Sequence, residues 1–168
     1  PDGKTVFVLG AGGAARAVAV QLALSGVKKI TLANRSKSRA VELAQLIMEK
    51  IGTPVQVEDW PSDESPQHRS LLEDVDLVVQ ATPVGMYPQV SATVPLSFEG
   101  LKPGAVVCDL IYNPKQTRFL ERAVQAGADT MNGLGMLLYQ GVLAFELWTG
   151  REAPVQVMKE ALRQSLET

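Results

Sequence analysis

The amino-acid sequence predicts an α/β protein with a doubly wound, parallel six-stranded sheet of the Rossmann type, strand order 3-2-1-4-5-6, followed by C-terminal helices. Three observations predict this class. Short apolar runs rich in β-branched residues alternate with segments of helical periodicity. A glycine-rich turn, GAGGAA, joins the first run to the first helical segment. No internal repeat, low-complexity stretch or interior linker interrupts the alternation.

Each expected strand is a short apolar run, and most of the expected helices end at a glycine, the usual residue after a helix C-terminus. The runs predict strands at residues 5–9, 28–33, 54–60, 76–81, 105–112 and 128–133. Apolar residues at helical spacing predict helices at residues 16–26, 38–52, 117–127, 134–150 and 154–167. Two polar or turn-rich segments are expected to be loops, namely residues 61–70 and 82–95.

Length and composition are those of one globular domain, which we expect to span residues 1–168. The chain is 46% hydrophobic and 20% charged. Its net charge of −2 and pI near 5.5 argue against a general nucleic-acid binder, so its cations must act locally if they act at all. A single cysteine, Cys108, excludes an internal disulfide and does not fit a thiolate metal cluster, and no metal is expected.

The sequence shows neither a membrane segment nor a secretory leader. Its longest apolar stretch, residues 135–148, is shorter than the roughly 20 residues that a spanning helix needs. The first residues, PDGKTVFV, lack the extended apolar segment of a signal peptide. We therefore expect a cytoplasmic protein that binds no membrane. Pro1 lies only a few residues before a core strand, which suggests that the chain was cut from a longer protein.

The glycine-rich turn matches the dinucleotide-binding pattern G-x-G-x-x-[GA] through Gly10, Gly12 and Ala15. Gly10 permits the tight turn, Gly12 has no Cβ to block a pyrophosphate, and Ala15 lets the helix pack close to the strand. The free N–H groups and the positive dipole end of the helix would then hold phosphates. A glycine-rich turn without a ligand is the alternative.

The end of the second strand reads ANRSKSRA and carries cations where many dinucleotide-binding folds have an acid. An acid there binds both ribose hydroxyls and selects NAD, and it would repel a 2′-phosphate. Asn34 removes that repulsion, Arg35 can form a bidentate pair with a phosphate, and Arg39 lies four residues later on the same helix face. Lys37 is consistent with a solvated residue. The sequence therefore predicts a site for NADP, and a solvated cationic helix start is the alternative.

Three further strand ends carry polar or small residues that would face the cleft. Thr82 opens a Thr-Pro-x-Gly-Met loop, although an ordinary turn explains it equally well. Tyr112 closes the fifth strand, where a core or rim tyrosine is the alternative to a ligand contact. Met136 and Gln140 share one face of the apolar helix that follows NGLG, and the Gln140 amide needs a partner, either local backbone or a polar substrate.

These motifs together, in this order, resemble the cofactor domain of the shikimate dehydrogenase family. The resemblance covers nearly the whole chain and is carried by GAGGAAR, NRS-x-x-R, ATPVGMYP, D-x-x-Y-x-P-x-x-T and GLGML-x-x-Q. It implies an NADP-dependent oxidoreductase that reduces 3-dehydroshikimate to shikimate in aromatic amino-acid (chorismate) biosynthesis. One departure is Gln80, where the family commonly has Asn.

The resemblance also implies roles for individual residues. The pyrophosphate would be bound by Gly10, Ala11, Gly12, Gly13 and Ala14. The 2′-phosphate and adenine would be bound by Asn34, Arg35, Ser36 and Arg39. The ribose and nicotinamide would be lined by Thr82, Leu110 and Gly133, with Met136 packed beside the nicotinamide. The substrate would be reached by Tyr112 and Gln140.

Family members carry an N-terminal substrate domain with a Ser-x-Ser motif and a catalytic Lys–Asp pair, and we expect that domain to be missing here. No catalytic residue is expected within this chain, because its nearest candidate, Lys115, resembles a solvated turn residue. The helix expected within residues 154–168 would pack on the missing domain through an apolar face. That face would consist of Val155, Val157, Met158 and Leu162. Such an uncovered face also allows a homodimer.

Two alternatives to a shikimate dehydrogenase remain open at this point. One is a quinate/shikimate dehydrogenase or a paralogue that acts on a related cyclic hydroxy acid, since substrate choice would lie mostly in the missing domain. The other is a non-catalytic NADP-binding module, suggested by the missing acid–base pair.

Overall fold

The computed structural model describes residues 1–62 and 67–165. Its strands are β1 Thr5–Leu9, β2 Lys29–Ala33, β3 Val55–Glu58, β4 Leu77–Gln80, β5 Val106–Asp109 and β6 Asp129–Met131. Its helices are α1 Gly13–Leu24, α2 Lys37–Lys50, α3 Gln67–Leu72, α4 Arg118–Gln125, α5 Leu134–Thr149 and α6 Val155–Ser165. Every helix in this described part of the chain is too short or too polar to cross a lipid bilayer.

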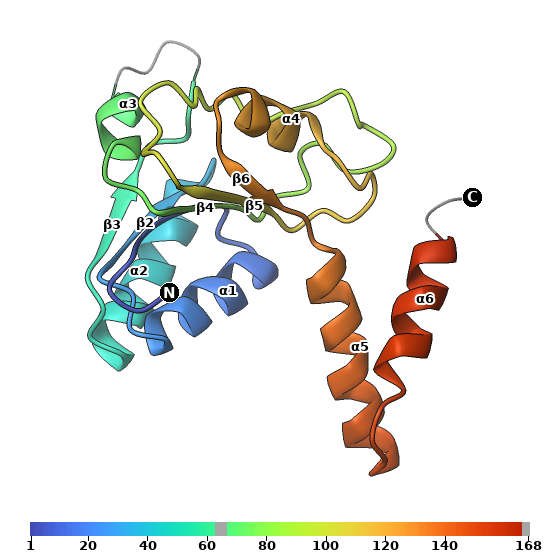
Figure 1. Ribbon diagram of the computed structural model, residues 1–168. Helices are drawn as coiled ribbons and strands as arrows, with labels where there is room; N and C mark the ends of the chain where they lie inside the picture. The colour runs from blue at the N-terminus through green and yellow to red at the C-terminus, as the bar shows by residue number, and fades with distance from the viewer. Residues whose placement is uncertain (63–66, 166–168) are drawn as a thin grey trace.

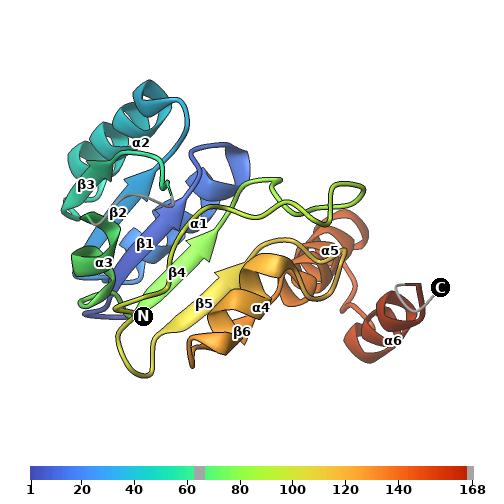
Figure 2. The ribbon, with the colours of Figure 1, turned by 90° about the horizontal axis from the view of Figure 1, so that it is seen from above.

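The six strands form one parallel sheet in the order β3-β2-β1-β4-β5-β6, which confirms the predicted order (Figure 2). The register places Val8 of β1 between Leu32 of β2 and Val79 of β4. The chain leaves β1 toward β2 and β3, then returns to β4 on the other side of β1. The carboxyl ends of β1 and β4 therefore form the switch point at which such sheets bind ligands.

Helices cover both faces of the sheet, with α1 and α2 on one face and α3 and α4 on the other (Figure 1). Successive residues of β1 point to opposite faces. Val8 is buried in the α1–α2 layer, while Phe7 is buried in the other layer with Phe119 of α4. Each such side chain contributes about 1.5–3 kcal/mol by its burial. On α1 the residues that face the sheet are alanines, Ala15 and Ala19 among them, so the helix can lie close to the strands.

Most element boundaries differ from the sequence-based expectation by one or two residues, and three differences are larger. Strand β5 ends at Asp109, whose carboxylate accepts the Ile111 N–H and turns the chain, so Tyr112 does not close the strand as predicted but lies three residues beyond it. Helix α1 begins at Gly13, three residues before the predicted start, because the glycine turn passes directly into helical backbone.

Helix α3 lies partly within the predicted loop 61–70, which was wrong from residue 67 onward. The polar composition of this segment favours a loop, but Leu72 at the end of α3 is fully buried in the core and anchors the helix. Residues 63–66 of the predicted loop and 166–168 at the end of the chain lie outside the described residues.

Helices α5 and α6 extend away from the sheet and pack on each other (Figure 1). Gly150, in the left-handed conformation, ends α5. Three of the four apolar residues expected on the outer face of the last helix, Val155, Met158 and Leu162, instead pack toward α5, and Val157 is 68% exposed. Large apolar side chains are also exposed along α5, at Tyr139, Leu143, Leu147 and Trp148.

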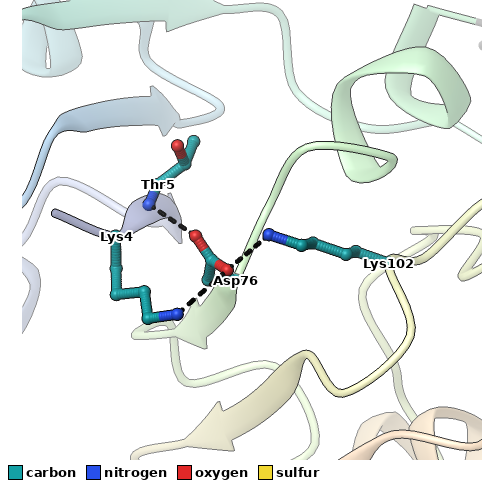
Figure 3. Close-up of polar contacts among 4 residues, drawn as sticks. All are labelled: Lys4, Thr5, Asp76 and Lys102. Atoms are coloured by element: carbon teal, nitrogen blue, oxygen red, sulfur yellow. Dashed lines mark hydrogen bonds and ion pairs between the residues drawn. The ribbon is translucent and has the colours of Figure 1, made fainter.

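At the amino-terminal edge of the sheet, Asp76 joins three segments that are far apart in the sequence (Figure 3). Its carboxylate accepts a hydrogen bond from the Thr5 backbone N–H at 2.9 Å and lies 2.6 Å from Lys102 Nζ and 3.5 Å from Lys4 Nζ. The hydrogen bonds from Lys102 and Thr5, followed by the charges of the two lysines, lower the pKa of Asp76 to about 2. The carboxylate therefore stabilises the starts of β1 and β4.

We predict that Asp76→Asn lowers the free energy of unfolding by about 1–2 kcal/mol near neutral pH. This range allows for the screening, by solvent, of the interaction between Asp76 and the partly exposed side chains of Lys4 and Lys102. The folded-state pKa lies below the unfolded value, so this contribution exists above about pH 4 and is lost as the pH falls through about 2. Urea unfolding at several pH values measures the difference. Glu99→Gln, which breaks the exposed Arg69–Glu99 pair, is the control and should change stability by less than about 0.5 kcal/mol. A pH-independent deficit in Asp76→Asn would contradict the electrostatic account.

Candidate functional site

Four backbone hydrogen bonds hold five chain segments side by side at the carboxyl edge of the sheet. They continue the ladder beyond the strand ends: Gly10 N–H to Ala33 O at 2.8 Å, Ala81 N–H to Leu9 O at 2.8 Å, Leu110 N–H to Gln80 O at 2.9 Å, and Gly133 N–H to Ile111 O at 3.0 Å. The residues that follow β1, β2, β4 and β5, together with the start of α5, therefore lie along one edge. Most of the predicted site residues belong to these segments.

The glycine turn after β1 is compact on one side and open on the other. Gly10 has φ of +121°, and a Cβ on it would lie 3.0 Å from Ala81 O, so any other residue would be strained there. Gly12 has φ of −82° and caps α1, and a Cβ on it would meet nothing within 4 Å. The space above Gly12 is thus open to a ligand, while Gly10 fixes the turn against the β4 end.

The first turn of α1 lies at this open space and is suited to bind an anion. The first N–H groups of an α-helix have no acceptor within the helix, and here the N–H groups of residues 13–15 precede the bond from Arg16 N–H to Gly12 O. No acidic residue occupies the first turn, and no side chain caps it. Ala15 is fully buried against the core. Free amides and the helix dipole make this position favourable for phosphate oxygens.

The end of β2 presents an exposed group of polar and basic residues at the start of α2. The Asn34 side-chain amide donates to Ser36 O at 2.8 Å and shapes the turn. Arg35 and Arg39 are exposed, and within residues 1–62 and 67–165 neither side chain makes a hydrogen bond or ion pair. Both guanidinium groups are therefore available to an external anion.

Lys37, by contrast, has a partner within the chain. Its Nζ lies 2.7 Å from Asp59 Oδ1 at the end of β3, and this hydrogen bond raises the pKa of Lys37. Lys37 thus neutralises the charge of Asp59 beside the basic group and is not simply a solvated residue. Arg35 and Arg39, in contrast, keep free donors at this end of the site.

A cavity of about 380 Å³ lies at the carboxyl ends of β4 and β5, beside the start of α1. It is lined by Ala14, Ala81, Thr82, Pro83, Met86, Tyr87, Leu110, Ile111, Tyr112, Asn113 and Met136. Of the predicted residues, Ala14, Thr82, Leu110, Tyr112 and Met136 meet here. A second hollow, of about 460 Å³, lies at the far end of α4 between the segments 98–101 and 122–126 and contains none of the predicted residues.

The remaining predicted residues occupy distinct positions. Gly133 lies directly against the β5 end, where a Cβ would collide with Leu110 O. Gln140 is exposed one helical turn beyond Met136 and does not line the cavity. Its side-chain amide donates to Leu137 O at 3.1 Å, which agrees with the alternative that local backbone is its partner. Met86, Tyr87 and Asn113 line the cavity but were not singled out, although they lie inside the motifs ATPVGMYP and D-x-x-Y-x-P-x-x-T.

Beneath this cavity lies a buried polar network that the sequence did not reveal. Asp109 and Gln80 are fully buried and Thr117 is 1% exposed. The Asp109 carboxylate accepts hydrogen bonds from Thr117 Oγ1 at 2.7 Å, the Ile111 N–H at 3.0 Å and Gln80 Nε2 at 3.3 Å. Burial raises the pKa of Asp109 to about 6, against the lowering effect of these three hydrogen bonds. A signal was present in the spacing of Asp and Thr in D-x-x-Y-x-P-x-x-T.

Comparison with known proteins gives two matching family models. The model described as shikimate / quinate 5-dehydrogenase matches residues 2–86, and that described as shikimate 5'-dehydrogenase C-terminal domain matches residues 133–163. A shikimate dehydrogenase (NADP(+)) of Desulforamulus reducens is 53% identical over 166 residues, which cover 99% of this chain and 56% of that protein. The chain thus spans about half the length of the curated relatives it matches.

Solved structures share the fold. The ligand-free 5-ketofructose reductase of Gluconobacter sp. strain CHM43 superposes with a TM-score of 0.85 at 41% identity, covering 98% of this chain and 57% of that one. Shikimate 5-dehydrogenase from Listeria monocytogenes, in complex with shikimate and NAD, gives a TM-score of 0.86 at 40% identity, covering 96% of this chain and 56% of that one. Since the first family model matches half of the sequence, the chain belongs to the shikimate / quinate 5-dehydrogenase family.

Proposed function

We propose that this chain is the NADP(H)-binding half of a cytoplasmic shikimate dehydrogenase. The whole enzyme would transfer a hydride between NADPH and 3-dehydroshikimate to give shikimate, in the biosynthesis of aromatic amino acids. One observation carries the proposal: an open glycine turn at the start of α1 and two unpaired arginines at the start of α2 lie on adjacent strand ends. The name of the Desulforamulus reducens relative, which specifies NADP(+), supports it.

The glycine turn fits the pyrophosphate of such a cofactor. The proposed contacts are the segment Gly10, Ala11, Gly12, Gly13 and Ala14. The open space above Gly12 and the free amides at the start of α1 would receive the phosphate oxygens. The close contact between Gly10 and the β4 end would hold the turn in place before the ligand arrives.

The basic group at the β2 end fits a 2′-phosphate. We assign this contact to Arg35 and Arg39, with Asn34 and Ser36 completing the turn around the adenosine. Arginine binds phosphate oxygens bidentately, and no acid at position 34 opposes the added charge. The Listeria monocytogenes structure holds NAD, so the proposed preference for NADP rests on the cations of this chain.

The cavity beside α1 would hold the nicotinamide half. Thr82, Leu110 and Gly133 would border the ribose and nicotinamide, and Met136 would pack beside the ring. When bound, the nicotinamide supplies the hydride chemistry, and the chain positions it. The 37% exposed Tyr112 would reach the substrate from the cavity rim.

Neither Gln140 nor Lys115 lines the cavity. The Gln140 amide is exposed and would have to leave its bond to Leu137 O in order to contact a substrate. Lys115 is exposed at a turn outside the cavity. We therefore assign no catalytic residue to residues 1–168 and propose that the Lys–Asp pair implied by the family resemblance is supplied by the rest of the protein.

We further propose that residues 1–168 form a single domain whose C-terminal helical pair contacts the substrate domain. Helix α6 would make that contact within residues 154–168, where Val157 is exposed. The exposed apolar side chains of α5, among them Leu143 and Leu147, would extend the same surface. The structure explains why α6 alone offers little apolar surface: most of its apolar residues already pack on α5.

Two other functions have some support. A quinate-active enzyme is favoured by the family model, whose description names both substrates. The 41% identity to a 5-ketofructose reductase also indicates that this half of the protein is compatible with different substrates. Turnover of shikimate and quinate by the full-length protein separates these options. A non-catalytic NADP-binding module would bind the cofactor but turn over neither compound.

The cofactor assignment is tested by calorimetric titration of the chain with NADP⁺ and NAD⁺. Two charge-assisted contacts to one phosphate are worth ~3 kcal/mol, so we expect on the order of a hundredfold preference for NADP⁺. Arg35→Ala should remove most of this preference and leave NAD⁺ affinity nearly unchanged. Lys50→Ala, at the opposite end of α2, is the matched control and should preserve it. Equal affinity of the unchanged chain for both cofactors would refute the assignment.

A second prediction separates binding from folding within the glycine turn. Gly12→Ala should reduce NADP⁺ affinity by about tenfold or more, because the new methyl group occupies the space assigned to the pyrophosphate. It should destabilise the chain by less than about 1 kcal/mol, since its Cβ meets no protein atom. Gly10→Ala should instead lower the melting temperature markedly, because its φ is positive and its Cβ meets Ala81 O.

The control is Gly141→Ala in α5, whose Cβ would make only an ordinary contact with Met158. It should leave NADP⁺ affinity unchanged. Undiminished NADP⁺ binding by Gly12→Ala would show that the cofactor does not lie over this turn.

A further inference from the structure

We propose that Asp109, Gln80 and Thr117 form a positioning network that fixes the two loops bordering the nicotinamide half of the site. The three side chains do not line the cavity; they act through the backbone of residues that do. The inference deepens the proposed function and rests on it, because it assigns the cavity to the nicotinamide half of NADP(H).

The β5 side of the network is centred on the Asp109 carboxylate. One oxygen, Oδ1, accepts from the N–H of Ile111, two residues further along the same chain, at 3.0 Å. This bond bends the backbone into the tight turn that presents Leu110, Ile111 and Tyr112 to the cavity. The other oxygen, Oδ2, accepts from Thr117 Oγ1 at 2.7 Å. The carboxylate therefore ties the β5 end to the start of α4.

The β4 side of the network is held by the Gln80 side-chain amide. Its Oε1 accepts from the Thr82 N–H, and its Nε2 donates to Val84 O at 3.1 Å and to Asp109 Oδ1 at 3.3 Å. Gln80 thus makes three bonds, two of them to the loop that contains cavity residues Thr82 and Pro83. The Gln80 side chain therefore spans from this loop to Asp109.

Thr117 anchors the network to α4. Its Oγ1 donates to Asp109 and also accepts from the Leu120 N–H at 3.3 Å, so the same hydroxyl caps the helix. Leu120 is buried in the core, which fixes the helix start against the sheet. The network therefore runs from one loop, through a carboxylate, to a rigid element of the fold.

The composition of this network argues against a role that consists only of filling space in the core. A fully buried carboxylate is costly unless it is well hydrogen-bonded, and an apolar residue could fill the same volume at lower cost. Its bonds reach the backbone of Thr82 through Gln80 and of Ile111 directly, and both residues line the cavity. Because the network fixes both loops before a ligand binds, the loops lose less conformational entropy on binding.

The test compares two ligands on the folded chain. NADP⁺ spans both halves of the site, whereas adenosine 2′,5′-bisphosphate reaches only the α1 and α2 ends. We expect Thr117→Val to weaken NADP⁺ binding about tenfold, equivalent to one lost hydrogen bond, and to leave the bisphosphate affinity within about twofold. Thr117→Ser, which keeps the hydroxyl, should restore NADP⁺ binding. Asp109→Asn, which keeps the shape but loses the charge, should give an intermediate loss.

Amide hydrogen exchange of the ligand-free chain supplies a readout that does not depend on the cofactor. Thr117→Val should speed exchange of the Thr82 and Ile111 N–H groups several-fold, while the Gly10 N–H, bonded to Ala33 O, should be unchanged. Asp76→Asn, at the opposite edge of the sheet, is the stability control. It should lower the free energy of unfolding without affecting NADP⁺ affinity or the exchange of these two amides.

Equal weakening of both ligands by Thr117→Val, or unchanged exchange at Thr82 and Ile111, would overturn the positioning role while leaving the proposed function intact. A wild-type chain that binds neither ligand would refute the proposed function, and the inference with it.

Discussion

The close approach of the β1 end to its two neighbours is the constraint on which the rest of the site depends. Gly10 donates to Ala33 O at the β2 end and lies against Ala81 O at the β4 end, with a backbone conformation that only glycine adopts readily. The turn must therefore leave the sheet in one direction, and α1 begins three residues later. The same geometry sets the open amides of α1 between the basic group of α2 and the cavity beside β4 and β5.

Two aspartates at opposite edges of the sheet differ in their surroundings, in their pKa and in the segments that they join. Asp76 lies beside exposed lysines, which lower its pKa to about 2, and it joins the strand starts. Asp109 is fully buried, its pKa rises to about 6, and its partners are backbone and neutral side chains of the loops at the other edge. The first is placed to stabilise the sheet over the physiological pH range, and the second to shape the loops that border the cavity. The contacts that stabilise the strand starts and the contacts that shape the cavity loops thus lie at separate edges of the sheet.

The fold could be predicted almost completely because its signals are local and periodic: apolar runs, helical spacing and the glycine turn. Helix α3 was missed because its position depends on the burial of Leu72 in the core. The polar sequence of this segment does not indicate that tertiary contact. In the site, the segments at the strand ends could be located, but the Lys37–Asp59 pair and the Gln80–Asp109–Thr117 network could not, since each joins elements distant in sequence. The ligand roles of Arg35, Gln140 and the other site residues stay predictions.

The most direct test of the central claim is a map of backbone amide shifts during titration of the ¹⁵N-labelled chain with NADP⁺. One continuous ligand along the carboxyl edge should perturb residues 10–14, 34–39, 82 and 110–112 at the same ligand concentration, and leave the region of Asp76 and Lys102 unchanged. Perturbations confined to one of these segments, or centred on the Asp76 edge, would contradict the account.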